Sequence, residues 1–260
     1  MKRIVCGLLL MISFGATAQS STSCPLSSAV VIDGNADEWP MNWEDDDEKN
    51  FSYNVCADDK NLFVRVKTSE FFTKRKLTAF GFTLWFDPSG KKKKKYGLKF
   101  PSGGAEAEER LKMLDAEGGP GKSIGEQTDY QKRADRIMIT NLEIIELIGL
   151  ADDPVTATRS GITNGIKVSI GLDATGAYVY EALIPFKSYR LSKESIESLS
   201  VGFETGKFVA PKKKPTTKNS AMTTGDYSTS QLSRMQGYNN VGNPKLSYST
   251  YAWTKLEFKK

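Results

Sequence analysis

The sequence lacks histidine entirely, and this absence restricts its possible chemistry more than any other feature. It excludes Ser-His-Asp and Cys-His catalysis, zinc sites with histidine ligands and histidine-ligated haem. We therefore expect no haem cofactor. Any catalysis would have to come from carboxylates, and we expect the protein not to be an enzyme.

Long hydrophobic runs are also missing, because no segment reaches the roughly 20 apolar residues of a membrane-spanning helix. The longest apolar stretch, Ile4 to Phe14, follows the basic pair Lys2-Arg3 and precedes Ala16-Thr17-Ala18. This order of basic, apolar and small residues is typical of a secretory signal peptide. We expect cleavage between Ala18 and Gln19, and a secreted protein, periplasmic or extracellular, without a membrane span. The alternative is that residues 4–14 form a buried first helix of a cytosolic domain.

Cysteine is scarce, with three residues in the chain. Cys6 lies in the expected signal peptide, so the mature chain would keep Cys24 and Cys56. An exported protein can oxidise such a pair. The sequence leaves two outcomes open: a Cys24–Cys56 disulfide that ties the N-terminal segment to an early strand, or two unpaired cysteines with Cys56 buried in the sheet.

The formal charge is small, since 36 Lys and Arg side chains against 31 Asp and Glu give +5. Loss of Lys2 and Arg3 with the signal peptide would reduce it further. This balance is far from that of a nucleic-acid binder, so no nucleic-acid partner is expected. The charges are clustered along the chain, and local fields therefore matter more than the net value.

Alternation of apolar and polar residues with a period of two predicts β-strands along most of the chain. The clearest example is residues 77–87, where Phe80, Phe82, Leu84 and Phe86 share one face and Trp85 lies on the other. Two hairpins are predicted by pairs of such runs on either side of a turn: 51–57 with 62–67, and 165–173 with 177–186. Further strands are expected at 29–32, 96–100, 201–204 and 250–258.

Helices are expected only as insertions between strands. The region 103–135 is rich in Ala, Glu and Leu and predicts helices at 105–116 and 126–135. A short helix is expected at 192–199, residues 136–149 suit either a strand or a helix, and 209–246 is a long polar loop. About nine or ten strands with turns between them indicate a mainly β fold, an antiparallel β-sandwich, in a single domain from 19 to 260.

Four motifs occur in the order found in a known family. Residues 31–39 form an Ile-Asp-Gly turn followed by an acidic residue and Trp, and residues 57–64 match an Asp-Asp-x-x-Leu-Tyr-Val hairpin. Residues 83–90 match the next strand and turn, and residues 180–186 a Glu-x-x-Ile-Pro strand. In these motifs the chain resembles the family 9 carbohydrate-binding modules and the related DOMON-like domains. The resemblance implies a β-sandwich that binds sugars through aromatic side chains.

Sugar rings stack on flat aromatic faces with polar groups nearby for the hydroxyls. Trp85 is the first candidate for such a face, and Trp253 is the second, with Tyr251 on the same side of the last strand. The alternative is that Trp85 and Trp253 fill the second face of a sheet that is buried on both sides. Trp39, in the opening turn, is expected to have a core role.

Asp33, Asn35 and Asp37 have the spacing of the first ligands of a calcium loop, with Glu44 at the position of the last one. Glu38 replaces the glycine that an EF-hand loop requires, and Pro40 breaks its backbone path. A looser structural calcium site that uses Asp33 or Asp37 remains open. The alternative is a solvated acidic loop.

Two lysine runs stand out, Lys91-Lys92-Lys93-Lys94-Lys95 after a turn and 212–214 in the polar loop. If the two runs are adjacent, they would attract an anionic glycan or another acidic cell-surface polymer through a salt-sensitive field. The alternative is a charged hairpin tip that prevents pairing at the edge of a sheet.

A glycosidase would need two carboxylates across the sugar. Glu181, Asp87 and Glu204 lie in or near strands, but nothing in the sequence pairs them. We therefore expect a secreted, non-catalytic protein that binds a polysaccharide or glycan. An interaction or scaffold protein on the same fold, or a carboxylate-based glycoside hydrolase, are the alternatives.

Overall fold

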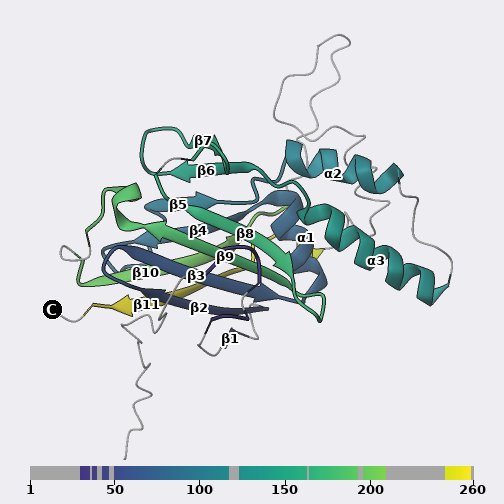
Figure 1. The fold of residues 1–260 in the computed structure, drawn as a ribbon, viewed down its shortest axis with the longest axis horizontal. Helices are drawn as coiled ribbons and strands as arrows, with labels where there is room; N and C mark the ends of the chain where they lie inside the picture. The colour runs from purple at the N-terminus through teal and green to yellow at the C-terminus, as the bar shows by residue number, and fades with distance from the viewer. Residues whose placement is uncertain are drawn as a thin grey trace, which may run out of the picture.

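The protein is an antiparallel β-sandwich, which confirms the predicted fold class (Figure 1). The computed structural model describes residues 30–35, 37–39, 43–46, 50–116, 123–162, 164–192, 196–208 and 244–258. One sheet has five strands in the order β1-β2-β3-β9-β8, and the other has six in the order β11-β10-β4-β5-β6-β7. The helices gather at one end of the sandwich, and α2 and α3 extend beyond it (Figure 1).

The five-stranded sheet consists of β1 (Glu44–Asp46), β2 (Phe51–Ala57), β3 (Asn61–Thr68), β8 (Lys167–Leu172) and β9 (Tyr178–Pro185). The six-stranded sheet consists of β4 (Phe82–Asp87), β5 (Tyr96–Lys99), β6 (Ile144–Ile148), β7 (Val155–Thr158), β10 (Ser198–Thr205) and β11 (Tyr251–Glu257). The helices are α1 (Phe71–Phe80), α2 (Ala105–Ala116) and α3 (Ile124–Ile139), with 3₁₀ turns at Phe186–Tyr189 (η1) and Pro244–Leu246 (η3).

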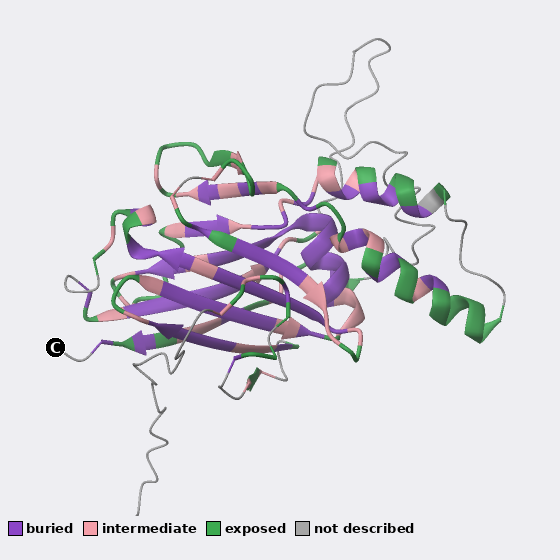
Figure 2. Cartoon of the chain, in the orientation of Figure 1, coloured by how far each residue is buried: buried purple, intermediate pink, exposed green. Residues whose placement is uncertain are grey.

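The main core lies between the two sheets, where the alternating apolar residues of each strand meet (Figure 2). Aromatic pairs join the sheets: the ring centroids of Phe82 and Tyr180 are 4.9 Å apart, as are those of Tyr53 and Phe203. Both predicted hairpins are present, as β2–β3 and β8–β9. Period-two alternation was sufficient to find these strands because one face of each is buried in this core.

Two predicted strands are wrong in part. Residues 77–80 belong to α1, so the predicted strand 77–87 starts only at Phe82. Glu70 caps the first turn of α1, with its carboxylate accepting from the Thr73 N–H at 2.6 Å, and Gly81 ends the helix at φ +95°. The capped first turn and the glycine that ends the helix favour α1 more strongly than the alternation of residues 77–80 favours a strand. Of the predicted strand 29–32, residues 30–32 are described, and they form no strand.

The region between β5 and β6 is helical, as predicted, but its second helix is longer than expected. α3 starts at a capping box between Ser123 and Glu126 and continues to Ile139, four residues beyond its predicted end. β6 then follows, so the ambiguous segment 136–149 contains the end of a helix and a strand. None of the helices in the described part of the chain has the length and hydrophobicity needed to cross a membrane.

One buried carboxylate attaches the N-terminal segment to the outer face of the five-stranded sheet. Glu181 of β9 is fully buried and accepts the backbone N–H groups of Asp33 and Gly34, at 3.2 and 2.8 Å, through Oε2. Its Oε1 accepts the indole N–H of Trp39 at 2.6 Å. Gly34 is needed here, since it has φ +93° and a Cβ at this position would lie 2.5 Å from the Gly171 nitrogen of β8. Trp39 is buried against Phe63, in agreement with its expected core role.

Burial raises the pKa of Glu181 to about 7, against the lowering effect of its hydrogen bonds from Gly34, Trp39 and Asp33. Arg65 lies directly opposite on β3 and is also buried, with its guanidinium 4.1 Å from the ring centroid of Trp43. Burial lowers the pKa of Arg65, and the charge of Glu181 acts in the opposite direction. The motif residues 31–39 and the Glu-x-x-Ile-Pro strand therefore meet at one buried polar centre.

We predict that Glu181→Ala lowers the free energy of unfolding by about 3 kcal/mol or more, because it leaves three N–H donors without their acceptor and removes the charge that faces Arg65. Glu146→Ala is the matched control, since Glu146 lies on a strand of the other sheet in a partly exposed ion pair with Lys99 at 2.9 Å. The control should cost less than about 1 kcal/mol. Urea unfolding monitored by fluorescence measures both, and equal effects of the two substitutions would contradict the role given to Glu181.

Glu181 also predicts how stability depends on pH. A carboxyl group whose pKa rises from 4.5 to about 7 on folding holds its proton in the native state over a range in which the unfolded chain releases it. The extra stability that comes from retaining this proton is therefore fully present below pH 4.5 and is lost as the pH rises through about 7. Glu181→Gln cannot titrate, so the difference in unfolding free energy between wild type and this variant should shrink across that range. A difference in unfolding free energy that stays constant from about pH 4.5 to about 7.5 would contradict the raised pKa of Glu181.

Candidate functional site

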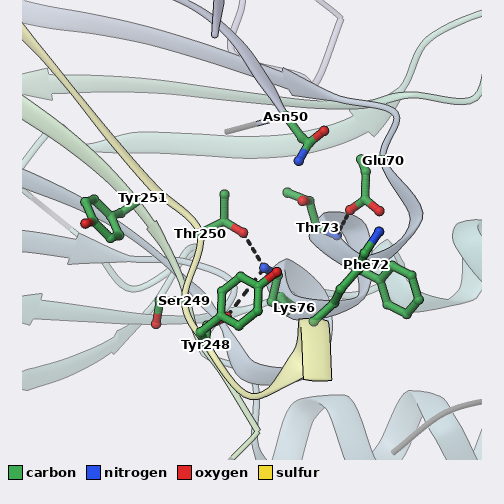
Figure 3. A pocket seen from close by; sticks show the side chains of 10 residues that line it. Asn50, Glu70, Phe72, Thr73, Lys76, Tyr248, Ser249, Thr250 and Tyr251 are labelled. Atoms are coloured by element: carbon green, nitrogen blue, oxygen red, sulfur yellow. Dashed lines mark hydrogen bonds between the residues drawn. The ribbon is translucent and has the colours of Figure 1, made fainter. Parts of the chain in front are cut away.

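Two surfaces of the described structure combine aromatic rings with polar groups. The first is a hollow of about 250 Å³ at the end of the sandwich where the helices gather, which we call the end pocket (Figure 3). Its lining comes from the start of α1 and from the chain between η3 and β11, with one residue from before β2: Asn50, Glu70, Phe72, Thr73, Lys76, Lys245, Tyr248, Ser249, Thr250 and Tyr251.

Lys76 lies between the aromatic residues of the end pocket. Figure 3 shows Tyr248 and Phe72 on either side of it. Its ammonium group donates to the Thr250 hydroxyl and, at 3.5 Å, to the Tyr248 carbonyl, and it lies 5.0 Å from the Tyr248 ring centroid. Burial lowers the pKa of Lys76, while the charge of Glu70 raises it and that of Lys245 lowers it further.

The rings of the end pocket are accessible to a ligand. Tyr248 and Tyr251 are 55% and 57% exposed, so a ligand in the pocket can contact both rings. Around the rings, the ammonium of Lys76 can donate, the carboxylate of Glu70 can accept, and the amide of Asn50 can do both. The pocket therefore presents flat faces together with a mixed set of hydrogen-bonding groups.

The second surface is the outer face of the six-stranded sheet around Trp85 and Trp253, which we call the tryptophan face. Both side chains are partly exposed and point away from the core, since their strand neighbours Leu84 and Ala252 are buried in it. Cross-strand pairing places five residues in one row: Trp253, Gly202, Trp85, Gly97 and Ile148. Tyr251 lies one row further along, opposite Glu204, and also lines the end pocket.

Each indole of the tryptophan face lies flat over the glycine of the next strand. A Cβ at Gly202 would lie 2.9 Å from three ring atoms of Trp253, Cδ2, Cε2 and Cε3. A Cβ at Gly97 would lie 3.1 Å from Cε3 and Cζ3 of Trp85. The two glycines thus allow the rings to rest on the sheet, and the Lys94 ammonium lies over the Trp85 ring.

Polar contacts fix the orientation of Trp85. Its indole N–H donates to Glu204 Oε2 at 2.6 Å, and Lys94 pairs with the same carboxylate at 2.6 Å. The Lys94 ammonium is also 5.6 Å from the Trp85 ring centroid. The predicted alternative, that both tryptophans fill a doubly buried sheet, does not describe these partly exposed rings.

The carboxylates considered for catalysis have other contacts. Glu181 is buried under the N-terminal segment, and Glu204 is paired with Lys94 and Trp85. Asp87 is fully buried and accepts the backbone N–H groups of Ser89, Lys91 and Lys93, together with the Ser89 hydroxyl. Burial raises the pKa of Asp87, but these hydrogen bonds outweigh it and hold the pKa below its usual value.

The lysine run 91–95, which we call the lysine turn, joins β4 to β5. Both strands have neighbours on each side, so the turn does not belong to a sheet edge, and the predicted role in preventing edge pairing is wrong. Lys212-Lys213-Lys214 lies outside the described residues.

The remaining predicted sites are the calcium residues Asp33 and Asp37, the Cys24–Cys56 disulfide and the cleavage site. Asp33 and Asp37 are exposed, and the side chains of Asp33 and Asn35 accept backbone N–H groups within their own turn. No group of three or more Asp, Glu, Cys or His side chains placed to hold a metal occurs among the described residues. Cys56 is disulfide-bonded, whereas Cys24 and the cleavage site Ala18-Gln19 lie outside the described part of the chain.

Sequence reasoning did not single out the end pocket. Phe72 and Lys76 come from a helix whose second half was predicted as a strand, and Tyr248 borders a segment predicted as a loop. The hydrogen bonds from Lys76 to Tyr248 and Thr250 link residues more than 170 positions apart in the chain. The only local signal was the second aromatic residue, Tyr248, shortly before Tyr251.

Comparison with solved structures gives a weak similarity in fold. No protein-family model matches the chain, and no curated protein matches it. Among solved structures, the chain is similar to a family 9 carbohydrate-binding module from Caldicellulosiruptor kristjanssonii in complex with glucose. The identity is 12%, the TM-score is 0.33, and the match covers 92% of this chain and 95% of that one.

We predict that Gly202→Ala tilts the Trp253 indole away from the sheet, because the new Cβ would lie 2.9 Å from its ring atoms. The change should cost about 1–3 kcal/mol of stability and alter the near-UV circular dichroism of the tryptophans. Gly125→Ala is the control, since no heavy atom lies within 4 Å of its Cβ position at the start of α3. If Gly202→Ala behaves like the control in both measurements, the flat packing of Trp253 is wrong.

Proposed function

We propose that the protein binds carbohydrate, and that the end pocket holds the sugar. The observation that carries this proposal is the position of the buried Lys76 ammonium beside the exposed ring of Tyr248. A sugar ring has an apolar C–H face and a rim of hydroxyls. It therefore suits a site in which Tyr248 offers a ring and Lys76, Glu70 and Asn50 offer donors and acceptors.

The chemistry of hydroxyl groups explains why both charges are useful in this pocket. A hydroxyl can donate to Glu70 and accept from Lys76 at the same time. Hydrogen bonds to charged groups are stronger than those between neutral groups, and burial of Lys76 increases this advantage. Two of the three Lys76 N–H groups are engaged by Thr250 and Tyr248, which fixes the direction of the third.

In this proposal the protein is a binding protein that acts after secretion. The sequence features in favour are the signal-like N-terminus and the resemblance to carbohydrate-binding modules at four motifs. The positions of Glu181 and Asp87, both fully buried, favour a binding role over a carboxylate-based hydrolase.

The test is isothermal titration calorimetry of the full chain with glucose, galactose, cellobiose and lactose. We expect at least one of these sugars to bind the wild type. Tyr248→Ala and Lys76→Met should each weaken that binding about tenfold or more, because each removes a central contact of a small site. Ile124→Ala and Lys112→Met, on exposed parts of α3 and α2, are the matched controls and should leave the affinity unchanged.

Two results would overturn the proposal. One is the absence of binding to every sugar in the panel by a wild type that unfolds cooperatively. The other is sugar binding that Tyr248→Ala and Lys76→Met leave unchanged, which would place the ligand elsewhere on the molecule.

A further inference from the structure

The lysine turn lies beside the tryptophan face and takes no part in the end pocket. Asp87 holds the backbone of this turn through the N–H groups of Ser89, Lys91 and Lys93. Lys94 reaches back over the face to Glu204 and to the ring of Trp85. The turn is therefore a built part of this surface.

The charge of the face is unbalanced at the turn. Elsewhere on it, Lys99 pairs with Glu146 at 2.9 Å and Lys255 pairs with Glu257 at 2.6 Å. Within the described part of the chain, no ion pair involves the exposed residues Lys91, Lys92 and Lys93. Three exposed lysines on a turn fixed by a buried carboxylate produce a local positive field directly beside the aromatic row.

The shape of the aromatic row suits an extended ligand rather than a compact one. Trp85 and Trp253 lie two strands apart with a glycine between them, which separates their backbones by about 9.5 Å. Flat rings at this spacing, both resting on glycine, offer consecutive stacking positions along a line across the strands. A protein partner would be expected to bring side chains into hollows, and this row is flat because the glycines remove the intervening side chains.

We propose that the tryptophan face binds an extended acidic polysaccharide, with sugar rings stacked on Trp85 and Trp253 and acid groups paired with the lysine turn. This site is separate from the end pocket, because Trp85, Trp253 and the lysine turn line no part of that pocket. Stacking supplies affinity without charge, and the lysines select chains that carry carboxylate or sulfate groups.

The experiment compares two polymers with the same backbone. Polygalacturonate carries a carboxylate on each ring, and its fully methyl-esterified form carries none. In affinity electrophoresis or biolayer interferometry with the full chain, polygalacturonate should bind more tightly at low salt. The preference should fall as the salt concentration rises, because exposed charges are screened.

Two sets of substitutions separate the parts of the site. Replacement of Trp85 and Trp253 by leucine keeps an apolar side chain over each glycine but removes the flat ring, and it should weaken polygalacturonate binding about tenfold or more. Replacement of Lys91, Lys92 and Lys93 by glutamine should remove the preference for the acidic polymer while residual stacking persists. Replacement of Lys112, Lys132 and Arg133 by glutamine gives the same net charge at exposed positions on α2 and α3 and should leave the preference intact.

The outcomes distinguish this proposal from the one for the end pocket. Tyr248→Ala should leave polygalacturonate binding unchanged, and the leucine variants should leave binding of small sugars unchanged. Equal binding of the two polymers by the wild type would contradict the proposal that the ligand is acidic. Polygalacturonate binding that survives both leucine substitutions, in variants with a cooperative thermal transition, would overturn the tryptophan face as the site.

Discussion

The buried carboxylate of Glu181 is the interaction on which the arrangement of this molecule depends. It accepts three N–H groups from a segment that begins about 150 residues earlier in the chain, and it faces the buried guanidinium of Arg65. A buried charge or proton-bearing carboxyl is stable only where such partners are present. The N-terminal segment is consequently fixed across the outer face of the five-stranded sheet, where Trp39 and Trp43 pack and lie close to the Arg65 guanidinium.

The two sides of the sandwich differ in what their tryptophans contact. On the six-stranded side, tryptophans rest on glycines, and at the adjoining end the exposed Tyr248 and Tyr251 border a polar hollow. Tyr251 belongs to both surfaces, since it lies one row from Trp253 and lines the end pocket. Tryptophan thus occurs in two environments. Trp39 is buried and donates to the buried carboxylate of Glu181. Trp85 and Trp253 are partly exposed and lie over glycines.

The sequence was sufficient for the β-sandwich because long alternating runs such as 51–57 and 177–186 each have one face in the core. It was insufficient at residues 77–80, where a capped helix and the Gly81 stop overrode a short alternation. It identified Trp85 and Trp253 as candidates for a sugar-binding face. It could not show that each ring lies over a glycine, because that pairing depends on the order of the strands in the sheet. The end pocket could not be found from sequence, because Lys76 and Tyr248 meet only once α1 packs beside the start of β11.

The proposal that an acidic glycan binds the tryptophan face, and not the Glu181 side, can be tested directly by the indole N–H signals of the four tryptophans in an ¹⁵N-labelled protein. The measurement is a titration with short oligogalacturonides, followed by two-dimensional NMR after assignment of each indole by substitution. The account predicts that the signals of Trp85 and Trp253 move together and saturate, while those of Trp39 and Trp43 stay in place. Movement confined to Trp39 and Trp43, or four signals that remain fixed at high ligand concentration, would contradict it.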